Sequence, residues 1–78
     1  MFTKHSISVG ERVINVRMEE DFWDALRDIA ADRNTTFPVL LQEIAANLDG
    51  NLNGPRLASA FRVYVLEHYL RLPAKTTQ

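Results

Sequence analysis

The residues best suited to recognising another molecule lie in one alternating segment near the N-terminus, Arg12–Met18. In a strand, successive side chains point to opposite faces, so Val13, Asn15 and Arg17 would share one face and the apolar residues between them the other. Arginine and asparagine can each form two parallel hydrogen bonds with a flat partner such as a base edge, whereas valine offers only an apolar contact. The segment therefore predicts a recognition surface.

The rest of the sequence shows no arrangement typical of catalysis or metal binding. It contains no cysteine and only two histidines, His5 and His68, so it lacks the ligands of a Cys/His zinc site. It also shows no nucleophile–base pair, no Gly-rich phosphate loop and no carboxylate pair in a plausible pocket. A chain of 78 residues leaves little room for a cleft of the usual size. We therefore expect no enzyme activity, no metal, no cofactor and no small-molecule ligand.

Length and composition indicate one small globular domain over residues 1–78. Hydrophobic residues make up 46% and charged residues 24% of the chain, which excludes disorder as its main state. No run of about 18 apolar residues could span a membrane, and Met1–Val9 lacks the apolar core of a signal peptide, so we expect a cytoplasmic protein. Below about 80 residues, a single core rarely supplies more than about 3–5 kcal/mol. Since disulfides and a zinc site are excluded, we expect the chain to be at least a dimer.

The charge of the chain is small in sum and uneven in distribution. The net charge of −1 argues against a protein that coats nucleic acid without specificity. In residues 1–17, however, Lys4, Arg12 and Arg17 are opposed only by Glu11, whereas six acidic residues oppose two arginines in residues 18–34. A modestly basic N-terminal segment therefore precedes an acidic one.

Two alternating segments flank Gly10-Glu11 and predict a β-hairpin with strands at about residues 5–9 and 12–18. Glycine at the first position of a two-residue loop suits a type II′ turn, and such a turn fixes the register. On a mainly apolar face the register pairs Val9 with Arg12, Ile7 with Ile14, and His5 with Val16. On a mainly polar, basic face it pairs Ser8 with Val13, Ser6 with Asn15, and Lys4 with Arg17.

Three helices are predicted after the hairpin, at about residues 20–33, 36–48 and 55–70. Acidic residues at the start of the first helix suit its dipole, and Asn34 suits a left-handed stop after it. Thr36 is a good N-cap for the second helix. The last helix is apolar almost all round, so it should be buried on more than one side, and a partner chain would supply the cover.

The first helix and the last loop carry two further patterns. Phe22, Leu26 and Ile29 follow the helical period and predict an apolar stripe, with Trp23 beside it. Residues 49–55 are rich in glycine, asparagine and proline and predict a loop before the last helix.

The order of these elements, with an alternating strand that ends in a basic residue, resembles the ribbon-helix-helix family of dimeric DNA-binding proteins. The matching stretch runs from Val13 to Met18, then into the first helix from Glu20, and then through Asn34-Thr35-Thr36 into the second helix. Three further motifs are similar to a longer bacterial subgroup with an extra N-terminal strand and a C-terminal helix: Lys4-His5-Ser6, Phe22-Trp23 and Phe61-Arg62-Val63-Tyr64-Val65-Leu66-Glu67-His68-Tyr69. The resemblance implies an α+β fold, in which an N-terminal β-hairpin or ribbon is followed by three α-helices in an intertwined homodimer.

The resemblance also implies a function and the residues that perform it. A homodimer would insert an antiparallel β-ribbon into the major groove of a palindromic operator on double-stranded DNA and act as a sequence-specific transcriptional regulator of the repressor type. The residues that would contact bases are Val13, Asn15 and Arg17. The residues that would contact phosphates are Lys4, Ser6, Thr35 and Thr36. The residues that would form the dimer core are Ile14, Val16, Phe22, Leu26, Leu40, Leu41, Ile44, Phe61 and Val65.

An alternative stays open, in which the dimer is a protein-protein interaction module or an antitoxin-like adaptor with weak or no DNA binding. Its first support is the low basicity of the chain. Its second is the extra strand, because strands lie about 4.8 Å apart and four of them would span roughly 14 Å. That span exceeds the major groove, which is about 12 Å wide.

Overall fold

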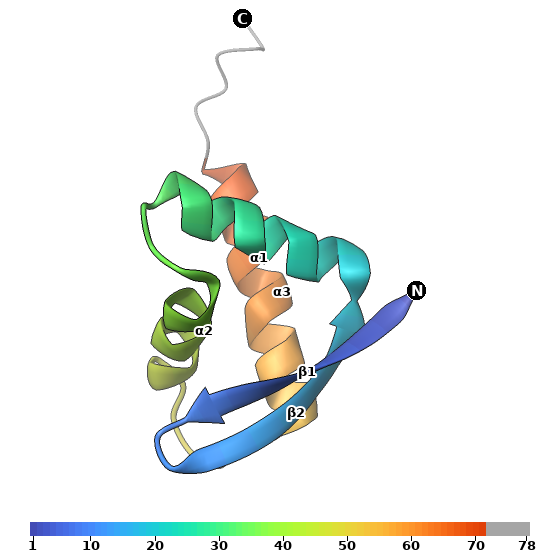
Figure 1. Ribbon diagram of the computed structural model, residues 1–78, viewed down its shortest axis with the longest axis vertical. Coiled ribbons are helices and arrows are strands. Elements are labelled where there is room, and N and C mark those ends of the chain that lie inside the picture. The colour runs from blue at the N-terminus through green and yellow to red at the C-terminus, as the bar shows by residue number, and fades with distance from the viewer. Residues whose placement is uncertain (72–78) are drawn as a thin grey trace, which may run out of the picture.

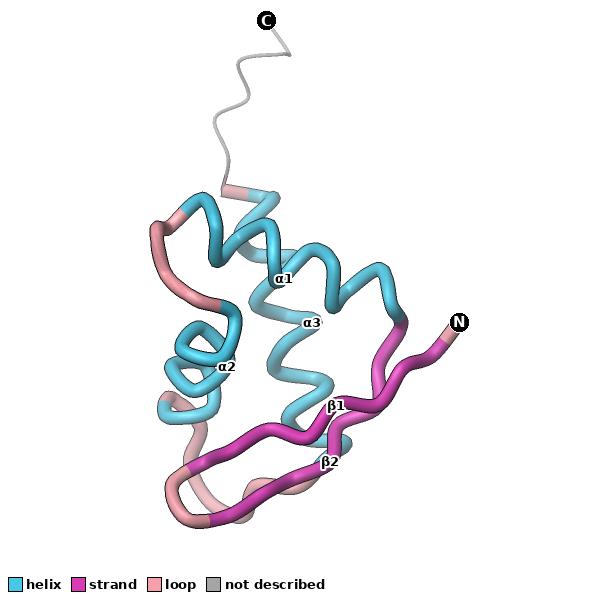
Figure 2. Tube along the Cα trace, in the orientation of Figure 1, coloured by secondary structure: helices cyan, strands magenta, loops and turns pink. Residues whose placement is uncertain are grey.

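The computed structural model describes residues 1–71 and shows a two-stranded antiparallel sheet followed by three helices (Figure 1). The sheet consists of β1 (Phe2–Val9) and β2 (Arg12–Glu19), and the helices are α1 (Glu20–Asp32), α2 (Phe37–Ala46) and α3 (Gly54–Leu70). The hairpin lies across one end of the molecule, and the helices lie on one side of it (Figure 2). The predicted α+β fold, a hairpin followed by three helices, is thereby confirmed.

The hairpin has the predicted register at every predicted pair, from Val9 with Arg12 to Lys4 with Arg17. Gly10 has a φ of 63°, and Asn34 is the only non-glycine residue with a positive φ in residues 1–71. Glu11 therefore has an ordinary negative φ, as the second position of a type II′ turn requires. The paired strands continue to Phe2 and Glu19, three residues further back and one further on than the alternation indicated.

The helix ends follow from local capping. Asn34 adopts the left-handed conformation after α1, with a φ of 58°. The hydroxyl of Thr36 accepts a hydrogen bond from the backbone N–H of Val39 at 3.3 Å, which makes Thr36 the predicted N-cap of α2. The side chain of Asn53 caps α3 in the same way, accepting from the backbone N–H of Arg56 at 2.8 Å. This cap starts α3 one residue earlier than the composition of the loop suggested.

The core is centred on Trp23, whose side chain is fully buried. Its ring lies 4.4 Å from that of His5 and 5.9 Å from that of Phe61, between centroids. Its Nε1–H donates to the carbonyl oxygen of Thr3 at 2.9 Å, so the one polar atom of the indole is satisfied. The prediction that Trp23 lies beside the apolar stripe is wrong. Both Phe22 and Trp23 fit the helical period of α1, and the structure buries Trp23 and leaves Phe22 half-buried.

The residues predicted for a dimer core are already covered within one chain, apart from Phe22. Eight of them belong to the buried core of the single chain: Ile14, Val16, Leu26, Leu40, Leu41, Ile44, Phe61 and Val65. The cover comes from β1 on the hairpin side and from α3 across α1 and α2 (Figure 1). Their burial therefore needs no second chain, and their contact with one stays a prediction.

The outer edge of β2 is occupied by the start of α3. Residues that flank a two-residue turn form a hydrogen-bonded pair, and such pairs alternate with non-hydrogen-bonded ones. Asn15 belongs to a non-hydrogen-bonded pair, so its backbone N–H and C=O point away from β1. Gly54 lies at this position, since a Cβ built on it would be only 2.5 Å from the carbonyl oxygen of Asn15.

An interchain ribbon would need that same edge. A second strand would place an N–H about 2.9 Å from the Asn15 oxygen and its axis about 4.8 Å from β2. Gly54 fills this space. The ribbon in the structure is therefore the hairpin of one chain, and the intertwined arrangement expected from the sequence would require α3 to move.

Replacing Gly54 by alanine tests this close approach. Because the obstacle is a backbone atom, the helix start must shift, and we expect Gly54→Ala to lower the free energy of unfolding by about 1–3 kcal/mol. Urea unfolding followed by Trp23 fluorescence measures the change. Gln42→Ala, at an exposed position of α2, is the control and should stay within about 0.5 kcal/mol of the parent. Equal stability of Gly54→Ala and the parent would contradict the contact.

Candidate nucleic-acid interface

One face of the hairpin is exposed and carries five of the seven residues predicted to contact DNA. We call this surface the outer hairpin face. Its exposed members with predicted roles are Lys4, Ser6, Val13, Asn15 and Arg17, and Ser8 lies among them. Cross-strand pairing sets Lys4 opposite Arg17, Ser6 opposite Asn15, and Ser8 opposite Val13. The opposite face packs into the core through Ile7, Ile14, Val16 and Met18.

The pair Ser6–Asn15 is already ordered by a hydrogen bond. The hydroxyl of Ser6 donates to Oδ1 of Asn15 at 2.8 Å. This contact uses one lone pair of Oδ1 and leaves the other lone pair and the two Nδ2 hydrogens available. Asn15 can therefore still act as a donor and an acceptor toward a flat partner.

Arg17 is ordered by an aromatic neighbour that the sequence reasoning missed. Its guanidinium carbon lies 5.5 Å from the centroid of the Phe2 ring, within the range of a cation–π contact. Phe2 pairs with Glu19 across the hairpin and is 50% exposed, so it extends the outer hairpin face beyond Lys4. The signal for this role was the alternation itself, which places residue 2 on the same face as residues 4, 6 and 8.

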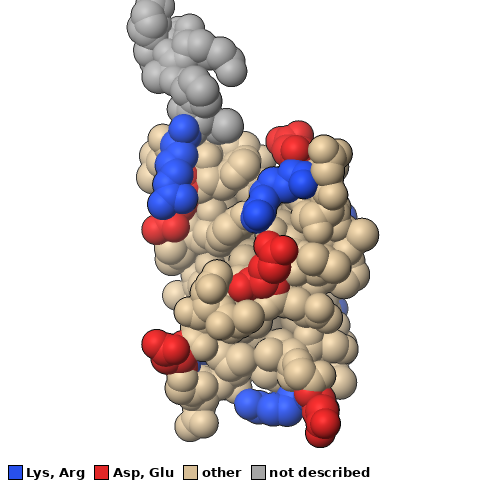
Figure 3. Space-filling model, turned by 90° about the vertical axis from the view of Figure 1, so that its left-hand side faces the viewer, with Lys and Arg blue, Asp and Glu red and all other residues tan. Residues whose placement is uncertain are grey.

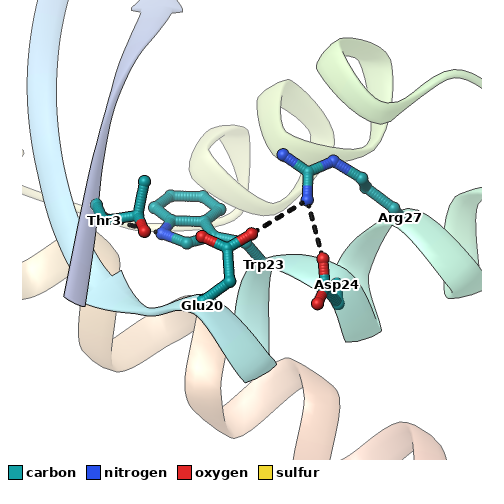
Figure 4. A network of polar contacts seen from close by, with 5 residues as sticks. All are labelled: Thr3, Glu20, Trp23, Asp24 and Arg27. Atoms are coloured by element: carbon teal, nitrogen blue, oxygen red, sulfur yellow. Dashed lines mark hydrogen bonds and ion pairs between the residues drawn. The ribbon is translucent and has the colours of Figure 1, made fainter. Parts of the chain in front are cut away.

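Acidic side chains adjoin this face, and two of them are held by cations. Arg62 donates to Oε1 of Glu19 through Nε at 3.0 Å and Nη2 at 2.8 Å, and this hydrogen bonding lowers the pKa of the Glu19 carboxyl. The pKa of Glu20 is also lowered, first by a hydrogen bond from Thr3 and then by Arg27. Figure 4 shows this network, in which Arg27 lies 3.5 Å from Glu20. Both carboxylates are thus tied to the junction between hairpin and α1.

The remaining two predicted contacts, Thr35 and Thr36, lie apart from the outer hairpin face at the start of α2. Thr35 is half-buried, and Thr36 uses its hydroxyl as the helix cap. The next two residues, Phe37 and Pro38, line a shallow hollow together with His5–Ser8 of β1. The start of α2 therefore borders the free edge of β1, and a phosphate role for the two threonines stays a prediction.

The surface shown in Figure 3 carries basic and acidic side chains in alternation, with no extended area of one sign. Within residues 1–71, no group of three acidic or histidine side chains could hold a metal ion. None of the described helices is long and apolar enough to cross a membrane. The outer hairpin face brings together the charges of Lys4 and Arg17, the amide of Asn15 and the ring of Phe2.

Comparison with known proteins gives one match. A model of the ribbon-helix-helix domain family matches residues 2–69, which is nearly the whole described chain. No curated protein and no solved structure matches.

The contact between Glu19 and Arg62 predicts how stability changes with pH. A carboxyl group whose pKa is lower in the folded than in the unfolded state stabilises the fold above the unfolded value of about 4.5 and loses that contribution as the pH falls. Glu19→Gln should therefore be less stable than the parent at pH 7, and the difference should shrink in acid. Urea unfolding of both proteins at pH 7 and pH 3 measures it. Arg62→Ala removes the donor of this contact, and its difference in stability from the parent should also shrink in acid. A difference that does not change with pH would contradict the assignment.

Proposed function

The chain belongs to the ribbon-helix-helix domain family, whose members are generally DNA-binding transcription regulators, and from this premise we propose that it is a sequence-specific regulator. The outer hairpin face would read the DNA. The observation that carries the proposal is the grouping of Lys4, Asn15 and Arg17 on the exposed side of a two-stranded ribbon. Two strands about 4.8 Å apart are narrower than a major groove about 12 Å wide, and the start of α3 lies beside β2 at Asn15.

The residue types suggest distinct roles on the DNA. Arg17 can donate two hydrogen bonds to O6 and N7 of guanine, and Asn15 can pair with N6 and N7 of adenine. Val13, which is 69% exposed, offers an apolar contact to a thymine methyl group. Lys4 and Ser6 from β1 would contact phosphates on one side of the groove. Thr35 and Thr36 would contribute through the amides at the start of α2.

The family typically binds DNA as dimers, and we propose that this chain acts as a homodimer on a palindromic operator. A repressor role would follow if the operator overlaps a promoter. Such a role places the protein in the cytoplasm, together with the DNA. Because the ribbon is complete within one chain, each copy would bring its own ribbon to a half-site, so the four-stranded sheet that is too wide for the groove does not arise.

A protein-interaction role is the second candidate, and the weak basicity of the outer hairpin face favours it. Only Lys4 and Arg17 carry positive charge among the residues of this face, and the whole chain has a net charge of −1. Specific DNA-binding proteins commonly neutralise more phosphates than two cations per chain can. In this candidate the ribbon would bind an extended peptide or a folded partner.

Selection of bound DNA from a random pool tests the base-reading residues. The parent should select a defined sequence, and Arg17→Ala should lose preference at one position of it, by about 1–3 kcal/mol for a bidentate contact. Asn15→Ala should lose preference at a neighbouring position. Arg71→Ala removes the same charge from the far end of α3 and should leave the selected sequence unchanged. If the parent selects no defined DNA sequence, sequence-specific DNA binding is rejected and the protein-interaction candidate is supported.

The proposed contact of Lys4 with a phosphate is tested by the salt dependence of DNA binding. Lys4→Ala should weaken binding to all DNA sequences alike and should reduce the dependence of the binding constant on salt by about one phosphate contact. Fluorescence anisotropy with labelled DNA at several salt concentrations measures both quantities. A change in sequence preference without a change in the salt dependence would place Lys4 on the bases and contradict this role.

A further inference from the structure

The outer edge of β1 carries a row of backbone groups without a backbone partner in residues 1–71. Lys4, Ser6 and Ser8 belong to the non-hydrogen-bonded pairs of the hairpin, so their N–H and C=O groups point away from β2. The sheet has two strands, and no backbone hydrogen bond of the described chain reaches these groups. All three residues are exposed. The edge therefore offers donors and acceptors at every second residue, which is the spacing that a further strand needs.

A hollow of about 280 Å³ lies beside this edge. One wall is His5–Ser8 of β1, and the other is formed at the start of α2 by Phe37, Pro38, Leu41 and Gln42. Three of these four α2 residues are apolar. Because successive side chains of a strand point to opposite faces, an extended chain paired with β1 would place every second side chain on the side of this hollow.

The charges around the edge favour an acidic segment. Lys4 is exposed, and no ion pair joins it to an acidic side chain in residues 1–71. Neither β1 nor the lining of the hollow contains an acidic residue, and the first turn of α2 has none either. The amides at the start of α2 add a partial positive charge. A carboxylate near Lys4 would therefore gain an ion pair without meeting a like charge on these elements.

We propose that the outer edge of β1 binds an extended, acidic segment of another protein, which joins the hairpin as a third strand. The segment is polar at the positions opposite Lys4, Ser6 and Ser8 and carries a carboxylate near Lys4. It is apolar at the positions opposite His5 and Ile7, whose side chains lie on the side of the hollow. Backbone hydrogen bonds supply the affinity, and the hollow and Lys4 supply the selectivity.

This inference goes beyond the proposed DNA reading and does not rest on it. The DNA would contact side chains of the outer hairpin face, whereas the segment would bind backbone groups at the edge of β1. The inference holds for any homodimer in which β1 stays at the edge of the sheet. It gives the proposed regulator a separate surface through which a protein partner can be recruited.

A second copy of β1 is a poorer occupant of this edge. The strand Phe2–Val9 contains Lys4 and His5 and no acidic residue. Two copies of β1 would therefore bring two Lys4 side chains to the same short sheet without a carboxylate for either. The charge of the edge thus favours a different chain over self-pairing.

Selection from a displayed pool of short random peptides tests the edge, with Ser8→Pro as the variant and Ser8→Ala as its matched control. The parent should select acidic peptides with alternating apolar residues. Proline removes the outward N–H of Ser8 and no hairpin hydrogen bond, so Ser8→Pro should bind the selected peptide at least about tenfold more weakly. Ser8→Ala keeps the N–H and should bind as the parent does. Selection of no peptide, or equal binding by the two variants, would overturn the proposal.

The contribution of Lys4 has its own readout in the same selection. Lys4→Gln keeps the backbone groups of the edge and removes the charge. It should still select alternating peptides, but without the preference for an acidic residue at one end. An unchanged acidic preference would contradict the proposed ion pair.

A measurement on the unaltered chain does not depend on how Ser8→Pro folds. In the free chain the amide hydrogens of Lys4, Ser6 and Ser8 should exchange rapidly with solvent, and the selected peptide should slow them at least about tenfold. N-methylation of the peptide at the alternate residues that face β1 should abolish binding, whereas methylation of the residues between them should not. Slow exchange of the three amides in the chain without peptide, increasing with protein concentration, would show that a second copy covers the edge and would overturn the proposal.

The two proposals fail separately, because none of these measurements contains DNA. A chain that binds the selected peptide at β1 but selects no DNA sequence rejects the regulator and keeps the peptide edge. A chain that selects a DNA sequence but no peptide keeps the regulator and rejects the peptide edge.

Discussion

The contact between the start of α3 and the outer edge of β2 determines which strand can pair with β2. Gly54 lies against the Asn15 carbonyl, so closely that a Cβ there would be 2.5 Å from the oxygen. At the far end of β2, Arg62 binds the carboxylate of Glu19 at 2.8 Å. The helix therefore runs along the strand and occupies the place that another strand would need. As a result, the ribbon of the described chain is completed by β1 of the same chain.

Because β1 of the same chain pairs with β2, the residues that stabilise the fold differ from those proposed to recognise a partner. Folding depends on a core around Trp23 that one chain buries by itself. Recognition is assigned to the outer hairpin face, where Asn15 and Arg17 are each held by a neighbour, Ser6 and Phe2. Side chains held in place before binding lose less conformational entropy when they meet a partner, so the small number of polar groups on the hairpin can still be selective.

The sequence predicts those features that depend on local rules, and it misses those that depend on distant contacts. The hairpin register followed from the alternation and from Gly10, and the cap at Thr36 followed from residue type. The choice between Phe22 and Trp23 could not be made, because both fit the same helical period and the partners of Trp23 lie on other elements. The role of Gly54 was hidden for the same reason, since it depends on a strand that lies far away in the sequence.

The most direct test of the closed ribbon is to determine which chain supplies the partner of β2. In an antiparallel ladder the Hα atoms of a non-hydrogen-bonded pair lie close together, so Ser6 and Asn15 should give a strong nuclear Overhauser effect. In a sample that mixes isotope-labelled and unlabelled chains, this effect is predicted only between atoms of the same chain. An effect between Asn15 of one chain and the β2 strand of another would contradict the account.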